Sequence, residues 1–153
     1  PPRRDRLTLA RAVAEVLELE AAALRQRRVR VERELDENVV VLGDLEKLKQ
    51  VVLNLVVNAL EATGEQGSLR VEVAVVDGMA QLSVMDDGPG VDPAILSEVF
   101  APFFTTKPAG TGLGLALVRK LVEQHGGQVR LRSRAVRGAV AEVRLPLASP
   151  PDP

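Results

Sequence analysis

Two glycine-rich segments contain the residues best suited to hold a charged ligand. The first, Asp86-Asp87-Gly88-Pro89-Gly90, follows an apolar run, and the second, Gly110-Thr111-Gly112-Leu113-Gly114-Leu115, opens a predicted helix. Glycine lets the backbone approach a ligand closely, and the free N–H groups and dipole of a helix start favour anions. The pattern predicts a phosphate cradle beside a turn that carries a carboxylate. A tight turn into a packed helix is the structural alternative for the second segment, because one glycine-rich run is weak by itself.

Asp86 is the candidate for recognising a base. An ionised carboxylate only accepts hydrogen bonds, and the 6-amino group of adenine donates them. Guanine presents an acceptor at the same place and would be repelled. The alternative is an ordinary aspartate in a turn at the end of a hairpin.

Two asparagines mark the predicted helix from Leu45 to about Thr63, whose N-cap is Asp44. Asn54, Asn58 and Glu61 are spaced i, i+4, i+7 and therefore share one face. Magnesium prefers hard oxygen ligands and keeps waters and phosphates in its shell, which suits the Asn58 amide. The alternatives are amides that cap neighbouring backbone, and a solvated or salt-bridged Glu61.

Residues 91–109 are expected to form a mobile lid over the ligand. Three prolines make a continuous helix unfavourable there. All three phenylalanines of the chain (Phe100, Phe103 and Phe104) fall in this segment, either as core or as a docking or closing surface. Lys107 follows Thr105 and Thr106, and it is placed either against a terminal phosphate as a point charge or in solvent.

These motifs, in this order, resemble those of the GHKL ATP-binding fold (the Bergerat fold), and most closely the catalytic ATP-binding domain of sensor histidine kinases. The resemblance covers about Leu7 to Pro146. The segments NALEA (58–62) and PFFTTK (102–107) make the nitrogen-regulation type the nearest match.

The resemblance implies that the chain binds ATP and Mg²⁺ and donates the γ-phosphoryl group to a histidine on a separate dimerisation domain. Asn58 would ligate Mg²⁺, Asp86 would bind adenine, and Asn54 and Lys107 would be catalytic. The isolated chain would be nearly inactive. The implied nucleotide-binding residues are Asn54, Asn58, Asp86, Gly88, Gly90, Lys107, Gly110, Thr111, Gly112, Leu113, Gly114 and Leu115.

The expected fold is a two-layer α/β (α+β) sandwich. A mixed sheet of about five strands is covered on one face by three helices, with an ATP lid. The helices are expected at Leu9 to about Gln26, at 45–63 and at 113–124. The strands are expected at 29–35, 69–75, 82–86, 128–134 and 139–147, with Asp77-Gly78 as a hairpin turn.

The resemblance also implies the domain boundaries and the partners. Residues 1–6 would be a linker from an upstream dimerisation and phosphoacceptor domain, residues 7–147 the ATP-binding catalytic domain, and residues 148–153 a disordered tail. The partners would be that upstream domain and a downstream response regulator. The isolated domain would be a monomer, and the full-length protein a homodimer.

Composition restricts the remaining classes of function. The 153 residues suffice for one domain. A net charge of −1 and an aromatic content of 2% argue against nucleic-acid binding. The absence of cysteine rules out disulfides and thiolate metal sites and suits the cytoplasm. No apolar run approaches the roughly 20 residues that span a bilayer, so a membrane anchor would lie elsewhere in a longer protein.

Three rival functions stay open within this fold. A GHKL ATPase uses a glutamate one helical turn before the magnesium-binding asparagine, and Asn54 at that position cannot take a proton. A nucleotide-sensing scaffold or pseudokinase is favoured by one departure: Ala139 and Val140 follow Gly138 where the family often has a threonine that supports the adenine-binding aspartate. An anti-sigma-factor kinase is disfavoured by PFFTTK and the long lid.

His125 is the only histidine of the chain, so it must be considered as a phosphoacceptor. It closes a predicted helix just before Gly126-Gly127, where a cation is favoured by the helix dipole. Kinases of the resembled family phosphorylate a histidine on a separate helical domain. We therefore expect His125 to have a structural role.

Overall fold

A five-stranded mixed sheet forms one layer of the protein, as seen in a computed structural model that describes residues 4–90, 94, 114–134 and 137–149. The strand order is β2-β4-β5-β7-β6. β2 pairs with β4 in parallel, and the other neighbours are antiparallel. The strands are β2 (Arg30–Leu35), β4 (Ser68–Val76), β5 (Met79–Asp86), β6 (Gln128–Ser133) and β7 (Ala139–Pro146). The predicted mixed sheet is confirmed.

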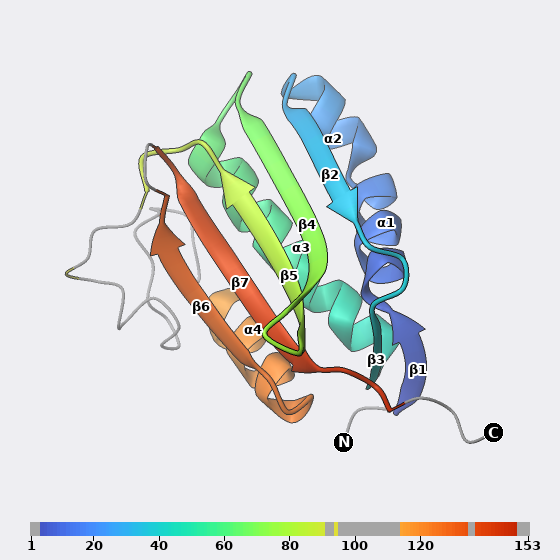
Figure 1. Cartoon of the computed structure of the whole chain (residues 1–153). Coiled ribbons are helices and arrows are strands. Elements are labelled where there is room, and N and C mark those ends of the chain that lie inside the picture. Colours follow the sequence, from blue (N-terminus) through green and yellow to red (C-terminus); the bar gives the residue numbers. More distant parts are fainter. Residues whose placement is uncertain (1–3, 91–93, 95–113, 135–136, 150–153) are drawn as a thin grey trace.

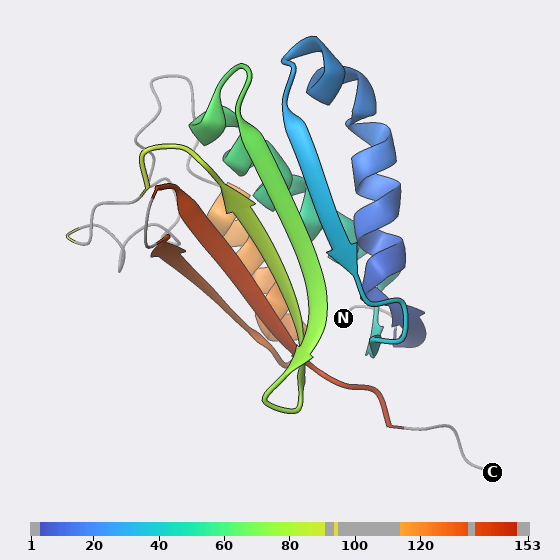
Figure 2. The same ribbon diagram turned by 45° about the horizontal axis from the view of Figure 1, so that its top comes forward.

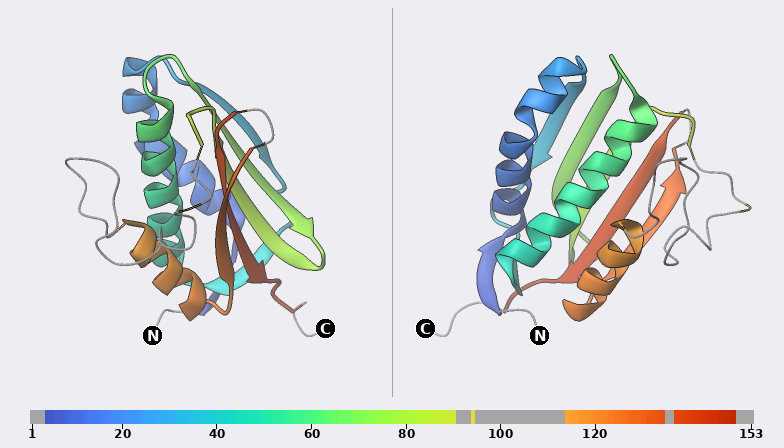
Figure 3. Two further views of the ribbon diagram at one scale, coloured as in Figure 1. Left: turned by 90° about the vertical axis from the view of Figure 1, so that its left-hand side faces the viewer. Right: turned by 180° about the vertical axis from the view of Figure 1, so that it is seen from behind.

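Helices form the second layer, and they cover only one face of the sheet (Figures 1 and 2). They are α1 (Leu9–Leu19), α2 (Ala21–Gln26), α3 (Leu45–Thr63) and α4 (Gly114–Gln124). Seen edge-on and from behind in Figure 3, α3 crosses the middle of the sheet between α1 and α4. The predicted two-layer sandwich is confirmed.

Alternation along the strands explains why only one face is covered. Leu69, Val71 and Val73 of β4 are at most 2% exposed and belong to the core shared with α3. Burying such side chains stabilises the fold by about 2 kcal/mol each. Between them, Arg70 points to the other face and bonds Glu32, Glu34 and Glu72 at 2.8, 2.8 and 2.6 Å. This polar ladder keeps the uncovered face compatible with water.

The turns and caps are those that the sequence indicates. Asp44 caps α3, and its Oδ1 accepts from the N–H groups of Glu46 (3.1 Å) and Lys47 (3.3 Å). Asp77 and Gly78 join β4 to β5 with φ of 52° and 76°. Positive φ at both central residues is the geometry of a tight hairpin turn, so the hairpin prediction is confirmed.

The first helix and both ends of the chain differ from expectation. The helix predicted over 9–26 is divided at Glu20, whose backbone (φ −90°, ψ 1°) leaves helical values. Asp5 and Arg6, expected in the linker 1–6, begin β1 (Asp5–Thr8). This strand pairs antiparallel with β3 (Val40–Gly43), and its Leu7 side chain inserts into the core at 7% exposure.

The first two residues of the expected disordered tail, Ala148 and Ser149, make hydrogen bonds to the domain. The N–H of Ala148 donates to the carbonyl of Val40 at 2.8 Å, and the Arg6 guanidinium donates to the carbonyl of Ser149. Main-chain hydrogen bonds of this kind leave no periodic signal in the sequence. The rest of that tail, residues 150–153, lies outside the described residues.

His125 connects the end of α4 to the start of α3. Its side chain is 3% exposed, its Nδ1 lies 2.7 Å from the carbonyl of Leu121, and its Nε2 accepts from the N–H of Asp44 at 3.1 Å. These partners require a proton on Nδ1 and a lone pair on Nε2. Both nitrogens are therefore engaged, which supports a structural role for this histidine.

Replacing His125 with alanine should lower the free energy of unfolding by about 3 kcal/mol, because two buried hydrogen bonds and a packed ring are lost. Urea denaturation measures this change. Gln124→Ala, at the exposed neighbouring position, is the control and should change stability by less than about 0.5 kcal/mol. A loss at His125 no larger than that of the control would contradict the connecting role.

Candidate functional site

The end of β5, at the upper left of Figure 1, carries a buried carboxylate. Asp86 is only 5% exposed. Its Oδ1 accepts from the N–H of Gly88 at 2.9 Å and from the N–H of Ala139 at 3.2 Å. Among the described residues both hydrogen bonds end on Oδ1, so Oδ2 is the oxygen that can accept from a ligand.

The N–H of Ala139 concerns the expected loss of a threonine that would support the Asp86 carboxylate. Ala139 stands where related proteins often have a threonine, and its methyl group cannot support the carboxylate. Its backbone N–H, which a threonine would offer as well, donates directly to Asp86 Oδ1. Asp86 therefore keeps this backbone hydrogen bond although the hydroxyl is missing.

Asp86 and Asp87 are neighbours with opposite electrostatic environments. Burial is the largest influence on Asp86 and raises its pKa, against the opposing effect of the two backbone N–H groups. A hydrogen bond from the Thr63 hydroxyl is the largest influence on Asp87 and lowers its pKa. A carboxylate kept buried at an energetic cost, beside one that is fully hydrogen-bonded, is characteristic of a functional site.

Asp87 fastens the turn to the end of α3 and the start of β4. Its Oδ1 accepts from the Thr63 hydroxyl, and its Oδ2 accepts from the backbone N–H (3.1 Å) and the hydroxyl (3.2 Å) of Ser68. The Asp87 side chain therefore joins the end of α3, the start of β4 and the turn after β5, and these bonds fix the position of Asp86 at the end of β5.

The connection between β6 and β7 approaches the same turn from the other side. Arg134 Nη1 donates to the carbonyl of Asp86 at 3.1 Å, and Arg137 Nε donates to the carbonyl of Asp87 at 2.7 Å. Gly138 has φ of 100°, and a Cβ there would lie 1.9 Å from the backbone carbonyl oxygen of Asp86. Only glycine fits this approach.

The turn also lies directly on α3. A Cβ on Gly88 would be 2.5 Å from the carbonyl oxygen of Ala62. Asn58 is four residues before Ala62 and therefore on the same side of the helix. The Asp86 turn therefore contacts α3 about one helical turn beyond Asn58.

The start of α4 meets α3 two turns earlier. A Cβ on Gly114 would lie 3.9 Å from Asn54 Oδ1, so this amide faces the first residue of α4. Eight residues of α3 separate Asn54 from Ala62, a rise of about 12 Å. One face of α3 thus joins the N-terminus of α4 to the Asp86 turn, with Asn58 between them.

Several predicted site residues fall outside the described part of the chain: Lys107, Gly110, Thr111, Gly112 and Leu113, with most of the expected lid. Gly90 follows the turn, and a Cβ there would lie 3.1 Å from Ser133 Oγ. Leu115 is half-buried and packs against the core. Glu61 is exposed.

The donor set suits a hard cation only in part. Asn54 and Asn58 offer two half-buried amides on one face of α3, and amide oxygens are acceptable magnesium ligands. Among the described residues no group of three or more His, Cys, Asp or Glu side chains could hold a metal ion. Waters and phosphate oxygens would therefore have to complete the shell.

Sequence reasoning missed five residues that build the site: Thr63, Ser68, Asp87, Arg134 and Arg137. Most of their contacts join positions far apart in the chain, so no local motif marks them. Only the pair Asp86-Asp87 carried a signal, because adjacent carboxylates repel unless hydrogen bonds stabilise one of them.

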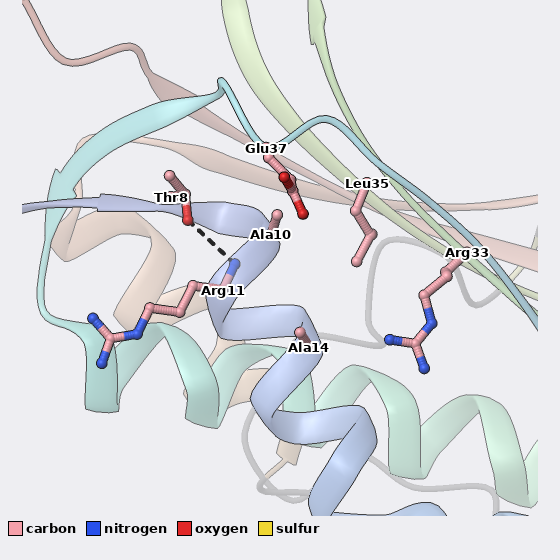
Figure 4. A pocket seen from close by; sticks show the side chains of 7 residues that line it. All are labelled: Thr8, Ala10, Arg11, Ala14, Arg33, Leu35 and Glu37. Atoms are coloured by element: carbon pink, nitrogen blue, oxygen red, sulfur yellow. Dashed lines mark hydrogen bonds between the residues drawn. The ribbon is translucent and has the colours of Figure 1, made fainter.

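Away from the Asp86 turn, a pocket lies between the start of α1 and the end of β2, with a volume of about 550 Å³. Thr8, Arg11, Arg33 and Glu37 supply its polar lining. In Figure 4 the guanidinium groups of Arg11 and Arg33 extend to opposite sides, and Thr8 is engaged in capping α1. Because its charges do not converge, this pocket has no arrangement suited to chemistry.

The chain is similar to known proteins in sequence. Residues 43–149 match the family described as "Histidine kinase-, DNA gyrase B-, and HSP90-like ATPase". Sensor histidine kinase ZraS of Salmonella typhimurium is 44% identical over 70% of this chain and 23% of its own length. Histidine-protein kinase AtoS of Escherichia coli is 38% identical over 94% of this chain and 24% of its own length.

A solved structure extends the similarity to three dimensions. The catalytic domain of histidine kinase ThkA has a TM-score of 0.88 and 34% identity, covering 95% of this chain and 96% of that domain. The chain spans about a quarter of the length of ZraS and AtoS. No helix among the described residues has the length and apolar character to cross a membrane.

The opposite pKa shifts of the two aspartates should give opposite pH dependences of stability. Since the pKa of Asp86 is raised, its contribution to stability is present at low pH and lost as pH rises through the folded pKa. Asp86→Asn should therefore gain stability over the wild type above about pH 4. Since the pKa of Asp87 is lowered, its contribution is present at neutral pH and lost on acidification.

Asp87→Asn should therefore be less stable than the wild type near neutrality, with the difference shrinking as the pH falls. Urea unfolding across the acid and neutral range measures both variants. Parallel curves for the two variants would contradict the assigned environments.

Proposed function

Because this chain belongs to the family of histidine kinase-, DNA gyrase B- and HSP90-like ATPases, as the catalytic ATPase domain of a histidine kinase, we propose that it binds ATP with Mg²⁺ and donates the γ-phosphoryl group to a histidine on a separate dimerisation domain. The observation that carries the proposal is the Asp86 carboxylate, buried and held by two backbone N–H groups.

At the base end, Asp86 Oδ2 accepts from the adenine 6-amino group. The Oδ1 oxygen is already committed to Gly88 and Ala139, so the carboxylate cannot rotate without losing two hydrogen bonds. A fixed acceptor discriminates well, because an acceptor on a competing base would face it without a proton between them.

At the phosphate end, the N-terminus of α4 and the amide of Asn54 stand together. Free N–H groups and the helix dipole favour the phosphates there, and we propose that the backbone of Gly110, Thr111, Gly112 and Leu113 completes the cradle. Asn58, between the two ends, would hold Mg²⁺. When bound, that ion would neutralise phosphate charge.

The transfer itself asks little covalent chemistry of this chain. An imidazole nitrogen of the dimerisation domain forms the new P–N bond as the bond from the γ-phosphorus to the leaving ADP oxygen breaks. This chain positions the nucleotide and stabilises charge, with Lys107 at the terminal phosphate. Asn54 cannot take a proton from water, so we expect slow hydrolysis.

Two solved relatives support the choice of ligand and partner. ShkA was crystallised full-length with AMPPNP, and its structure has a TM-score of 0.85 and 28% identity to this chain. ThkA was crystallised with the response regulator TrrA. We therefore propose an adenine nucleotide as the ligand and a response regulator as the downstream partner.

The wider setting is proposed on the same basis. The chain would work in the cytoplasm as part of a longer homodimeric kinase, with or without a membrane anchor. NALEA and PFFTTK favour the nitrogen-regulation type, while the relatives named above are ZraS and AtoS.

Phosphotransfer is tested by mixing this chain with γ-labelled ATP, Mg²⁺ and the dimerisation domain of the same kinase. Label should appear on the dimerisation domain and not on this chain, whose His125 is buried and engaged. Label on this chain, or none on a folded dimerisation domain while ATP is bound, would contradict the proposal.

Asp86→Asn should raise the dissociation constant for ATP by roughly 10- to 100-fold, because an amide presents a donor toward the 6-amino group. Equilibrium dialysis measures this constant. Asp77→Asn removes the same charge from the exposed hairpin and should leave ATP affinity unchanged. Equal affinities for wild type and Asp86→Asn would rule out base recognition by this carboxylate.

Asn58→Ala should remove the effect of Mg²⁺ on ATP affinity while retaining nucleotide binding in its absence, because the proposed protein ligand of the ion is lost. Titrations with Mg²⁺ and with a chelator measure this difference. Gln50→Ala, exposed on the same helix, is the control. Undiminished magnesium dependence in Asn58→Ala would assign the ion to other residues.

A further inference from the structure

The pairing of β5 with β7 ends just before the carboxylate. Met85 and Val140 are the last paired residues of this ladder. One residue further, the Asp86 side chain takes over and accepts from the N–H of Ala139. The Asp86 carbonyl accepts from the guanidinium of Arg134, the residue that follows β6. On the β7 side of β5, side-chain hydrogen bonds therefore follow directly after the last backbone pair, while Asp86 is still paired with Leu69 of β4 on the other side.

The two arginines that reach this turn are not needed to close their own connection. The N–H of Arg134 donates to the carbonyl of Gly138 at 2.8 Å, which closes the link between β6 and β7 through the backbone alone. Their side chains extend beyond that link, Arg134 to the carbonyl of Asp86 and Arg137 to the carbonyl of Asp87. The two arginines, which lie outside β5, thus bind the consecutive backbone carbonyls of Asp86 and Asp87.

We propose that Arg134 and Arg137 are positioning residues that hold the Asp86 turn and thereby set the selectivity of the site for adenine. The inference rests on the proposed function, because it assumes that Asp86 receives the base. Neither arginine is placed in contact with the nucleotide. Each acts through the main chain that aims the carboxylate.

Three features of the contact support this role. A hydrogen bond from a charged donor is stronger than a neutral one, and both contacts are of that kind. Gly138 lets the main chain approach Asp86 so closely that a Cβ at position 138 would lie 1.9 Å from the backbone carbonyl oxygen of Asp86. Ser133, whose Oγ is 3.1 Å from a Cβ built at Gly90, brings β6 against the far end of the same turn.

The charge of Arg134 also acts on the ionisation of the Asp86 carboxyl group. Burial is the largest influence and raises the pKa of Asp86, and the negative charge of Asp87 adds to that effect. The N–H groups of Gly88 and Ala139 lower the pKa, and the positive charge of Arg134 lowers it further. Only the ionised carboxylate is purely an acceptor. Arg134 thus helps to keep the group in the state that receives an amino group.

The test compares three single variants of the whole chain. Arg134→Met and Arg137→Met remove each guanidinium but keep an apolar side chain of similar length. Arg130→Met is the control, since Arg130 lies on β6, is exposed, and has no ion pair with any described residue. The dissociation constants for ATP and for GTP are measured for each, together with the thermal midpoint.

Both test variants should lower the ratio of ATP to GTP affinity by about fivefold, a typical coupling between neighbouring residues and a site. The control should keep the wild-type ratio. Arg137→Lys should recover part of the loss, because an ammonium can still donate to a carbonyl. In Arg134→Met, ATP binding should begin to fail at a higher pH on acidification than in the wild type.

Other results would overturn the inference. If Asp86→Asn loses ATP selectivity but both arginine variants keep the wild-type ratio, the arginines do not position the site and the proposed function stands. An equal loss for both nucleotides, with an unshifted pH profile, would assign them a merely structural role. If the wild type does not bind ATP, the proposed function fails and the inference fails with it.

Discussion

Keeping an ionised carboxylate buried at the end of a strand is the constraint on which this structure depends. Taking a charge out of water costs several kcal/mol unless polar groups replace the lost solvation. Asp86 receives two backbone N–H groups at one oxygen, from its own turn and from the start of β7. Glycines allow the close packing around this turn, because a Cβ at Gly88 would meet the Ala62 carbonyl of α3 and a Cβ at Gly138 would meet the Asp86 carbonyl.

A single helix sets the distance between the two ends of the site. α3 contacts the Asp86 turn at Ala62 and the first residue of α4 at Asn54. The stripe that fixes α3 to the sheet runs along its whole length, from Leu48 to Leu60. Packing of this stripe therefore fixes the Asp86 turn and the start of α4 relative to each other, and the face of α3 between them carries the Asn58 amide. Core and site are built from the same element.

Much of the fold was predictable because it follows periodic patterns. The apolar alternation of β4 and β5, the Asp77-Gly78 turn and the Asp44 cap are local signals, and the structure has all of them. The pairing of β1 with β3 was not predictable, since two short strands far apart in sequence meet through main-chain bonds. Asp87 and the arginines of the β6–β7 connection were missed for the same reason, because their partners are backbone carbonyls or distant hydroxyls.

The central claim is that the fixed carboxylate of Asp86 selects an adenine nucleotide. Calorimetric titration of the unmodified chain with ATP and then with GTP, in the presence of Mg²⁺, tests it most directly. The account predicts saturable binding of ATP at one site and binding of GTP that is at least tenfold weaker, the order of discrimination expected when a fixed acceptor faces the wrong group. Equal binding of the two nucleotides, or no heat from either with a folded chain, would contradict it.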